Sequence, residues 1–134
     1  MKLTKATNYA LHTMLFLAVN PPNEHIGVAK LAERQEVSTT YLSKILTKLV
    51  KAGMIESVSG ANGGYKLKPG WEEISFLDVI KAIEGLTPIF EYCHSHNPDC
   101  LIQKAIESAE EKLLNELNQT RIVDLANKMN EKSV

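Results

Sequence analysis

The sequence predicts a mainly α-helical fold with a small two-stranded β wing, a winged helix-turn-helix followed by a long C-terminal dimerisation helix. Three observations predict it. Residues 29–51 show helical apolar periodicity on both sides of a tight turn. Residues 54–67 contain two short strand-like runs separated by a Gly-rich segment. Residues 100–118 carry a long apolar stripe opposite an acidic face.

The first two elements are expected to be helices that bring the chain to the helix-turn-helix. Thr4 is suited to cap a helix that runs to about Val19, where paired prolines prevent its continuation. A shorter helix is expected from Val28 to Gln35. The turn that follows places Glu36 where a left-handed residue is often needed and where Gly would be the least strained choice.

The helix that begins after Ser38 has the composition of a recognition helix. Its inward face is apolar and consists of Leu42, Ile45, Leu46, Leu49 and Val50. Its outward face has hydroxyls and cations without a carboxylate, which suits a DNA major groove. We expect base or backbone contacts from Ser38, Thr39, Thr40, Tyr41 and Ser43, and phosphate contacts from Lys44, Lys48 and Asn62.

The wing is predicted from glycine positions. Gly53 ends the recognition helix, and strands are expected at 54–58 and 65–67. Asn62-Gly63 between them is a strong hairpin-turn signal. Further DNA contacts are expected from Thr4 before the first helix and from Ser59, Gly60 and Gly63 in the wing.

The second half is expected to hold a sensor loop and the dimerisation helix, which divides the chain into a DNA-binding domain (1–70) and a helical region (71–134). Ser75 caps a helix that Gly85 ends, Asp99 caps the long helix, and Thr120 caps the last one. The predicted dimer contacts are Ile102, Ile106, Ala109, Leu113 and Leu117. The same stripe could instead pack within one chain.

The distribution of charge favours a nucleic acid as partner of the first half only. Residues 1–70 hold nine Lys and Arg against four Glu, a net charge of +5, whereas residues 71–134 hold six basic and twelve acidic side chains, a net charge of −6. We expect a cytoplasmic protein, because the chain shows no signal peptide, no membrane span and only two cysteines. No spacing typical of an enzyme active site is present, so neither catalysis nor a small-molecule substrate is predicted.

The ordered motifs resemble the Rrf-two (Rrf2) family of bacterial winged-helix transcription regulators, which includes the iron–sulfur cluster regulator, the nitric-oxide-sensing repressor and the cysteine-metabolism repressor. The resemblance covers almost the whole chain and is carried by Leu3-Thr4, Tyr9-Ala10, residues 32–35 and 38–42, the wing sequence 60–67, and residues 78–80 and 82–85. It implies a homodimer held by the long helix. It also implies a recognition helix in the major groove and a wing directed to the minor groove.

Two positions depart from the family pattern. The residue before the wing glycine is commonly Arg, and here it is Ser59, which cannot supply that charge to the minor groove. Members that hold an iron–sulfur cluster generally offer three cysteines, whereas this chain has Cys93 and Cys100 alone. No cofactor is therefore predicted.

Three interpretations of the cysteines stay open. They could be ordinary thiols, or a redox pair in which Cys100 gains a stabilised thiolate from a helix N-terminus. With one or both of His94 and His96 they could also bind zinc or an iron–sulfur cluster of mixed ligation. The predicted function is a sequence-specific DNA-binding transcription regulator, a repressor responsive to redox change. The alternatives are a winged-helix module for protein–protein contact and an iron–sulfur- or zinc-dependent regulator.

Overall fold

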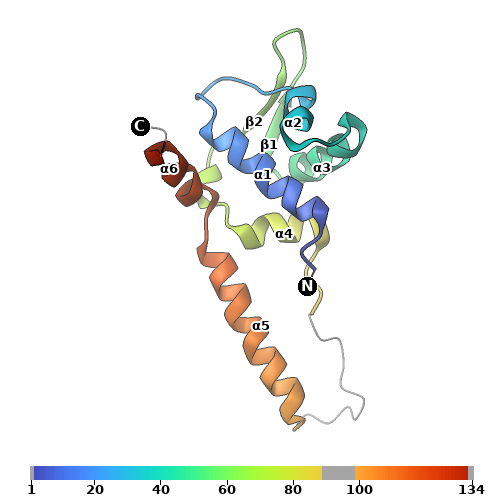
Figure 1. The fold of residues 1–134 in the computed structure, drawn as a ribbon, viewed down its shortest axis with the longest axis vertical. Coiled ribbons are helices and arrows are strands. Elements are labelled where there is room, and N and C mark those ends of the chain that lie inside the picture. Colours follow the sequence, from blue (N-terminus) through green and yellow to red (C-terminus); the bar gives the residue numbers. More distant parts are fainter. Residues whose placement is uncertain (1, 89–98, 133–134) are drawn as a thin grey trace.

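The computed structural model describes residues 2–88 and 99–132, and the helices account for most of them (Figure 1). The prediction of a mainly helical fold with a two-stranded wing is confirmed. In chain order the elements are α1 (Lys5–Val19), α2 (Val28–Gln35), α3 (Thr39–Lys51), β1 (Ile55–Val58), β2 (Gly64–Leu67), a 3-10 turn (Trp71–Glu73), α4 (Phe76–Glu84), α5 (Leu101–Gln119) and α6 (Ile122–Lys132).

The helix-turn-helix forms as its capping residues predict. The hydroxyl oxygen of Thr4 accepts from the Thr7 N–H and starts α1. Ser38 does the same for the Tyr41 N–H and starts α3. Between α2 and α3, Glu36 has the left-handed conformation expected of it, with φ of 54°. Such a residue costs about 1 kcal/mol more than Gly there, and its N–H bonds to the end of α2 offset part of that cost.

The two strands form an antiparallel hairpin in which Ile55 pairs with Leu67 and Val58 with Gly64. Ile26 adds a short bridge on the other side of β2, through hydrogen bonds of 3.0 and 2.8 Å with Tyr65. Gly64 is required by this bridge, because a Cβ there would lie 2.7 Å from the Ile26 backbone. Sequence reasoning treated Ile26 only as a lead into α2.

A single apolar cluster joins the first half of the chain to α4 and α6. Met14, Leu31 and Leu46 are fully buried in it, together with Val79 of α4 and Ile122 of α6. Backbone hydrogen bonds tie the starts of α4 and α6 together, from the Phe76 N–H to the Thr120 carbonyl and from the Ile122 N–H to the Ile74 carbonyl. The division at residue 70 stays a prediction, and this shared core lies across it.

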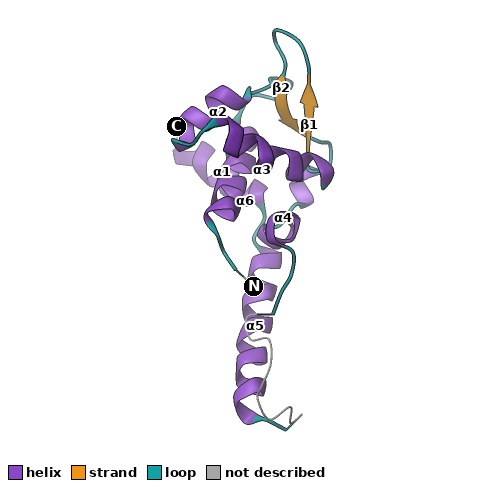
Figure 2. Cartoon of the chain, turned by 90° about the vertical axis from the view of Figure 1, so that its right-hand side faces the viewer, coloured by secondary structure: helices purple, strands orange, loops and turns teal. Residues whose placement is uncertain are grey.

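Helix α5 stands apart from that core, projecting from the body as a single rod (Figures 1 and 2). Its 19 residues include none that is buried. At about 1.5 Å per residue the rod is about 28 Å long.

Two predicted caps of the C-terminal helices were wrong. Cys100, not Asp99, is the N-cap of α5, and it makes no side-chain cap bond. The Asp99 carboxylate lies 3.8 Å from the Lys104 ammonium instead. Thr120 is instead the C-cap of α5, where its backbone N–H and its hydroxyl both donate to the Glu116 carbonyl. The α6 start is stabilised by Asp124, whose carboxylate accepts from the Arg121 N–H at 3.3 Å.

Candidate DNA-binding surface and cysteine region

The recognition helix α3 is divided sharply between a buried and an exposed face. Leu42, Ile45, Leu46 and Leu49 are buried, while Val50 at its edge keeps 36% of its surface exposed. On the other side Ser38, Thr39, Thr40, Tyr41 and Lys44 are exposed, and Ser43 is half-buried. The predicted apolar face is therefore confirmed for four of its five residues and was wrong for Val50, which lies at the edge of that face. The predicted contact residues of α3 lie together on one surface.

Tyr41 is held in place by α1. Its ring meets the Tyr9 ring edge-on, with centroids 5.8 Å apart and planes at 85°. The side chain still exposes 39% of its surface. An aromatic ring fixed in this way presents its remaining surface with little conformational freedom left to lose on binding.

Two of the predicted DNA contacts form hydrogen bonds to the end of α4. The Thr4 hydroxyl donates to the Glu84 carboxylate at the end of α4. The Lys48 ammonium donates to the Ile83 carbonyl at 3.2 Å, in the same turn of α4. Sequence reasoning missed Glu84. The available signal was an acidic residue in the last turn of a helix, where the helix dipole disfavours a negative charge.

The wing turn differs from the expected Asn-Gly turn. The Gly63 N–H donates to the Gly60 carbonyl at 3.0 Å, so Ala61 and Asn62 are its central residues. Among the described residues that are not glycine, only Asn23 and Glu36 have positive φ. Gly63 is needed for space, because a Cβ there would lie 2.1 Å from the Val58 carbonyl oxygen.

The tip of the wing, residues 59–63, carries no charged side chain. Ser59, Gly60 and Asn62 are exposed and Gly63 is half-buried. At the base of the hairpin the Lys66 ammonium lies 3.3 Å from the Glu56 carboxylate, its cross-strand neighbour. The tip can therefore offer DNA hydroxyl, amide and backbone groups, and Lys66, the cation nearest to it in the sequence, is paired with an acid.

Of the predicted sensor residues, Cys100 alone lies within the described part of the chain. It is partly exposed and occupies the N-cap of α5, with its carbonyl accepting from the Lys104 N–H at 3.1 Å. Cys93, His94 and His96 lie outside the described residues. Within 2–88 and 99–132 there is no group of three or more His, Cys, Asp or Glu side chains that could hold a metal ion.

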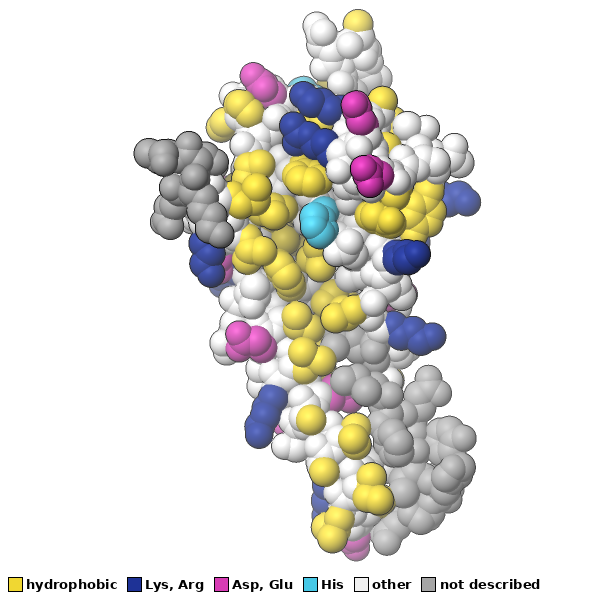
Figure 3. All heavy atoms as spheres, viewed as in Figure 1, with side chains coloured by type: hydrophobic (Ala, Val, Ile, Leu, Met, Phe, Trp, Pro, Cys, Tyr) yellow, Lys and Arg dark blue, Asp and Glu magenta, His cyan; other side chains and the backbone are white. Residues whose placement is uncertain are grey.

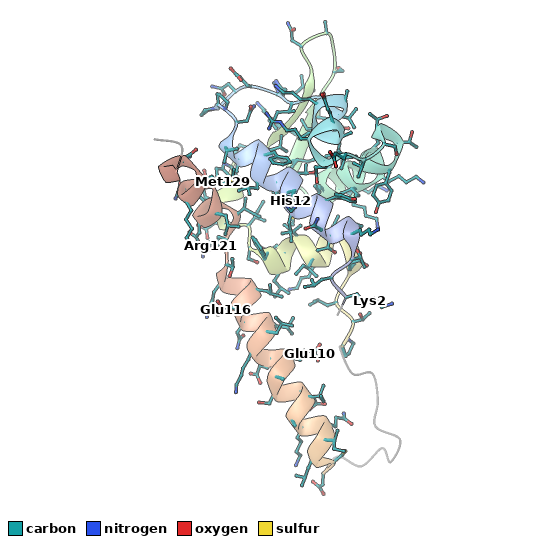
Figure 4. All side chains as sticks on the ribbon, in the orientation of Figure 1. Lys2, His12, Glu110, Glu116, Arg121 and Met129 are labelled. Atoms are coloured by element: carbon teal, nitrogen blue, oxygen red, sulfur yellow. The ribbon has the colours of Figure 1, made fainter. Side chains whose placement is uncertain are left out.

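The predicted dimer contacts line one side of α5. Ile102 exposes 70% of its surface and Leu113 37%, Ala109 is exposed, and Ile106 and Leu117 are half-buried. In Figure 3 apolar side chains follow α5 and continue onto the body beside a histidine. His12 of α1 and Met129 of α6 lie on this part of the body in Figure 4.

A small apolar cavity opens on the body where this stripe meets it. It has a volume of about 220 Å³ and is lined by Asn8, Leu11, His12, Leu15, Phe76, Ile122 and Leu125. Its walls come from α1, α4 and α6, the elements that the shared core brings together.

None of the described helices is long and apolar enough to cross a membrane.

Comparisons with known proteins agree with this geometry. A family model described as "Rrf2: Iron-dependent Transcriptional regulator" matches residues 3–128. The oxidized form of CymR from Staphylococcus aureus is 31% identical with a TM-score of 0.80, over 94% of this chain and 96% of that chain. CymR of B. subtilis, described as the global cysteine regulator, is 26% identical with a TM-score of 0.78, over 96% and 98%.

A third solved structure extends the match over the full chain. IscR of T. potens is 26% identical with a TM-score of 0.80, and the alignment covers 100% of this chain and 92% of that chain. The family match and the shared winged-helix fold show that the chain belongs to the Rrf2 family and is a DNA-binding transcriptional regulator.

Proposed function

We propose that this regulator is a cytoplasmic homodimeric repressor without enzymatic activity. In it, α3 reads the DNA major groove and the wing meets the adjacent minor groove. One observation supports the role of α3 in DNA recognition. The N-terminal half of α3 is exposed, rich in hydroxyls and free of carboxylates, while the opposite face is anchored in the core. Recognition helices commonly contact base edges through their N-terminal residues.

The contacts divide by chemistry. Thr39, Thr40, Tyr41 and Ser43 supply hydroxyls that contact base edges or the backbone, and Ser38 keeps its O–H available because its oxygen is the acceptor in the cap. Lys44 supplies charge to a phosphate, which adds affinity without sequence choice. Ser59, Gly60, Asn62 and Gly63 form the wing contact, which relies on polar and backbone groups.

The experiment compares two substitutions on α3 with a control on the same helix. Thr40→Ala is expected to lower the preference for the specific DNA site, since it removes a hydroxyl without changing charge. Lys44→Ala is expected to lower the affinity for all duplexes equally. It should also reduce the slope of log affinity against log salt concentration by about 0.9. Lys51→Ala, an exposed lysine at the far end of α3, is the control.

Binding is measured by fluorescence anisotropy at several salt concentrations. The specific probe is a duplex recovered from a random library with the full chain, and the reference is a scrambled duplex. Equal losses from all three substitutions would contradict the assignment of α3. Weak binding that ignores salt would favour the second candidate, a winged helix used for protein–protein contact, because phosphate contacts always carry a salt dependence.

The proposed dimer uses the α5 stripe. A helix with no buried residue and with Ile102 70% exposed leaves an apolar surface in water, which is typical of an interaction site. A second copy of the chain offers the same stripe under two-fold symmetry, so each favourable contact occurs twice. Two recognition helices would then meet successive half-sites of the DNA.

We further propose that Cys93 and Cys100 respond to oxidation. The similarity to CymR supports this, since one of the solved relatives is its oxidized form. Oxidation joins the two sulfurs and passes two electrons and two protons to the oxidant, such as a peroxide. A change at Cys100 alters the start of α5 and through it the separation of the two recognition helices.

The test is operator affinity before and after peroxide. The operator affinity of the parent is expected to change after peroxide. The operator affinity of the double variant Cys93→Ser, Cys100→Ser is expected to stay the same. Identical responses would contradict a thiol switch. An iron–sulfur cluster fits this chain poorly, because the chain has two cysteines and such clusters commonly use four thiolate ligands. The proposed thiol switch needs no metal. The remaining alternative to it is a zinc ion bound by the cysteines together with His94 or His96.

A further inference from the structure

The last turn of α4 contacts both the start of α1 and the recognition helix α3. Glu84, the final residue of α4, accepts at one carboxylate oxygen from the hydroxyls of Thr4 and Thr7, the latter at 3.5 Å. One residue earlier, the Ile83 carbonyl accepts from the Lys48 ammonium of α3 at 3.2 Å. Adjacent residues of one helix therefore hold the start of α1 and the middle of the recognition helix.

These contacts are specific in chemistry and in position. Thr7 is 1% exposed, and Glu84 is the partner of its hydroxyl, so the carboxylate satisfies a buried polar group. A carboxylate at a helix C-terminus is disfavoured by the helix dipole, and hydrogen bonds from hydroxyls offset that penalty. The Lys48 ammonium is favourable at the same end, because it donates to one of the last carbonyls of α4, where the helix dipole is negative.

We propose that Glu84 and Lys48 are positioning residues for DNA recognition. Together they fix the spacing between the α1 start and α3, so that hydroxyls on α3 reach base edges in register. This inference rests on the proposed use of α3 in the major groove. It reassigns Thr4, predicted as a DNA contact, and Lys48, predicted as a phosphate contact, to internal supports of the DNA-binding surface.

The first test uses two substitutions at Glu84 that remove the same charge. Glu84→Gln keeps an oxygen acceptor for the hydroxyls, whereas Glu84→Met keeps the length and loses the acceptor. Loss of a negative charge alone would strengthen binding of both variants to every duplex. Positioning predicts instead that Gln keeps the ratio of specific to scrambled affinity and that Met lowers it about fivefold, the effect of one ordinary hydrogen bond.

Equal ratios for the Gln and Met variants would overturn the role of Glu84. Thermal unfolding with circular dichroism checks that both are folded at the assay temperature. If Glu84→Met does not fold, Thr7→Val replaces it, because it removes the hydroxyl donor at nearly constant volume. Thr7→Val is expected to lower the same ratio, and an unchanged ratio would overturn the proposal.

The second test compares Lys48→Met with Lys44→Met on the same helix. Lys44 is exposed and is the predicted phosphate contact, so its loss is expected to reduce the salt slope by about 0.9 and to weaken both duplexes equally. Lys48→Met is expected to leave the salt slope unchanged and to lower the specific affinity alone. A slope reduced as much as by Lys44→Met would overturn the assignment, since Lys48 would then contact a phosphate directly.

Failure of the proposed function gives a different result. If α3 does not read DNA, Thr40→Ala leaves the specificity ratio unchanged and Lys44→Met leaves the salt slope unchanged. If only the positioning role is wrong, both of those variants behave as predicted and the Glu84 and Lys48 variants do not.

Discussion

Replacing Ile102 by Ala on the α5 stripe tests whether this surface holds two chains together. Ile102 exposes 70% of its surface in the single chain, so a partner could cover most of it. Complete burial of an Ile side chain contributes about 1.5–3 kcal/mol. Because 70% is available and Ala keeps the Cβ, we expect a loss of about 1 kcal/mol per chain. Two-fold symmetry doubles this to about 2 kcal/mol, or about 30-fold in the dimer dissociation constant.

The dissociation constant is measured by sedimentation equilibrium over a range of concentrations. Leu113→Ala is expected to have about half the effect, because 37% of its surface is exposed. Glu111→Ala on the opposite side of α5 is the matched control and should leave dimerisation unchanged. If the Ile102→Ala dimer dissociates no more readily than the Glu111→Ala dimer, the stripe is not the dimer interface.

Four further predictions concern the wing, the turn before α3 and the N-cap of α3. Gly64→Ala is expected to lower the free energy of unfolding by about 2–3 kcal/mol in urea titrations, because its Cβ would push Ile26 away and break two backbone hydrogen bonds; a loss below 0.5 kcal/mol would contradict this. Ser38→Ala should cost about 1 kcal/mol in the same assay through loss of the N-cap, whereas Glu36→Gly should gain about 1 kcal/mol by relieving a left-handed residue. Ser59→Arg should strengthen DNA binding and raise the salt slope by about 0.9 if the wing meets a groove, and an unchanged slope would place the wing away from DNA.

The helix-turn-helix was predictable because its determinants are local. Thr4, Ser38 and Ser75 each cap a helix with a hydroxyl that lies three residues before its donor. The 3.6-residue period of α3 specified which side chains are buried. The left-handed Glu36 could also be anticipated, since the length of the turn required such a residue even though its side chain does not favour it.

Contacts between residues far apart in the chain could not be predicted from the sequence. Nothing local marks Ile26 as a partner of Tyr65, because an isolated bridge of one residue has no alternating pattern. The caps of α5 and α6 were misplaced by one residue each, since Asp99 and Thr120 are common capping residues that lie directly beside the true positions. In the DNA-binding surface, the pattern identified Lys48 as an exposed cation and could not show that its ammonium faces the end of α4.

The placement of Cys100 relates the proposed sensor to the proposed interface. Cys100 is the N-cap of α5. Ile102, a predicted dimer contact that exposes 70% of its surface, lies two residues further along the helix. The N-cap leads directly into the first turn of a helix, whose N–H groups have no partners within the helix. A covalent change at Cys100 would therefore act on that turn first and displace Ile102 directly. Dimer affinity should consequently respond to peroxide in the parent and not in Cys100→Ser, and an oxidant that alters DNA binding at constant dimer affinity would require another route to α3.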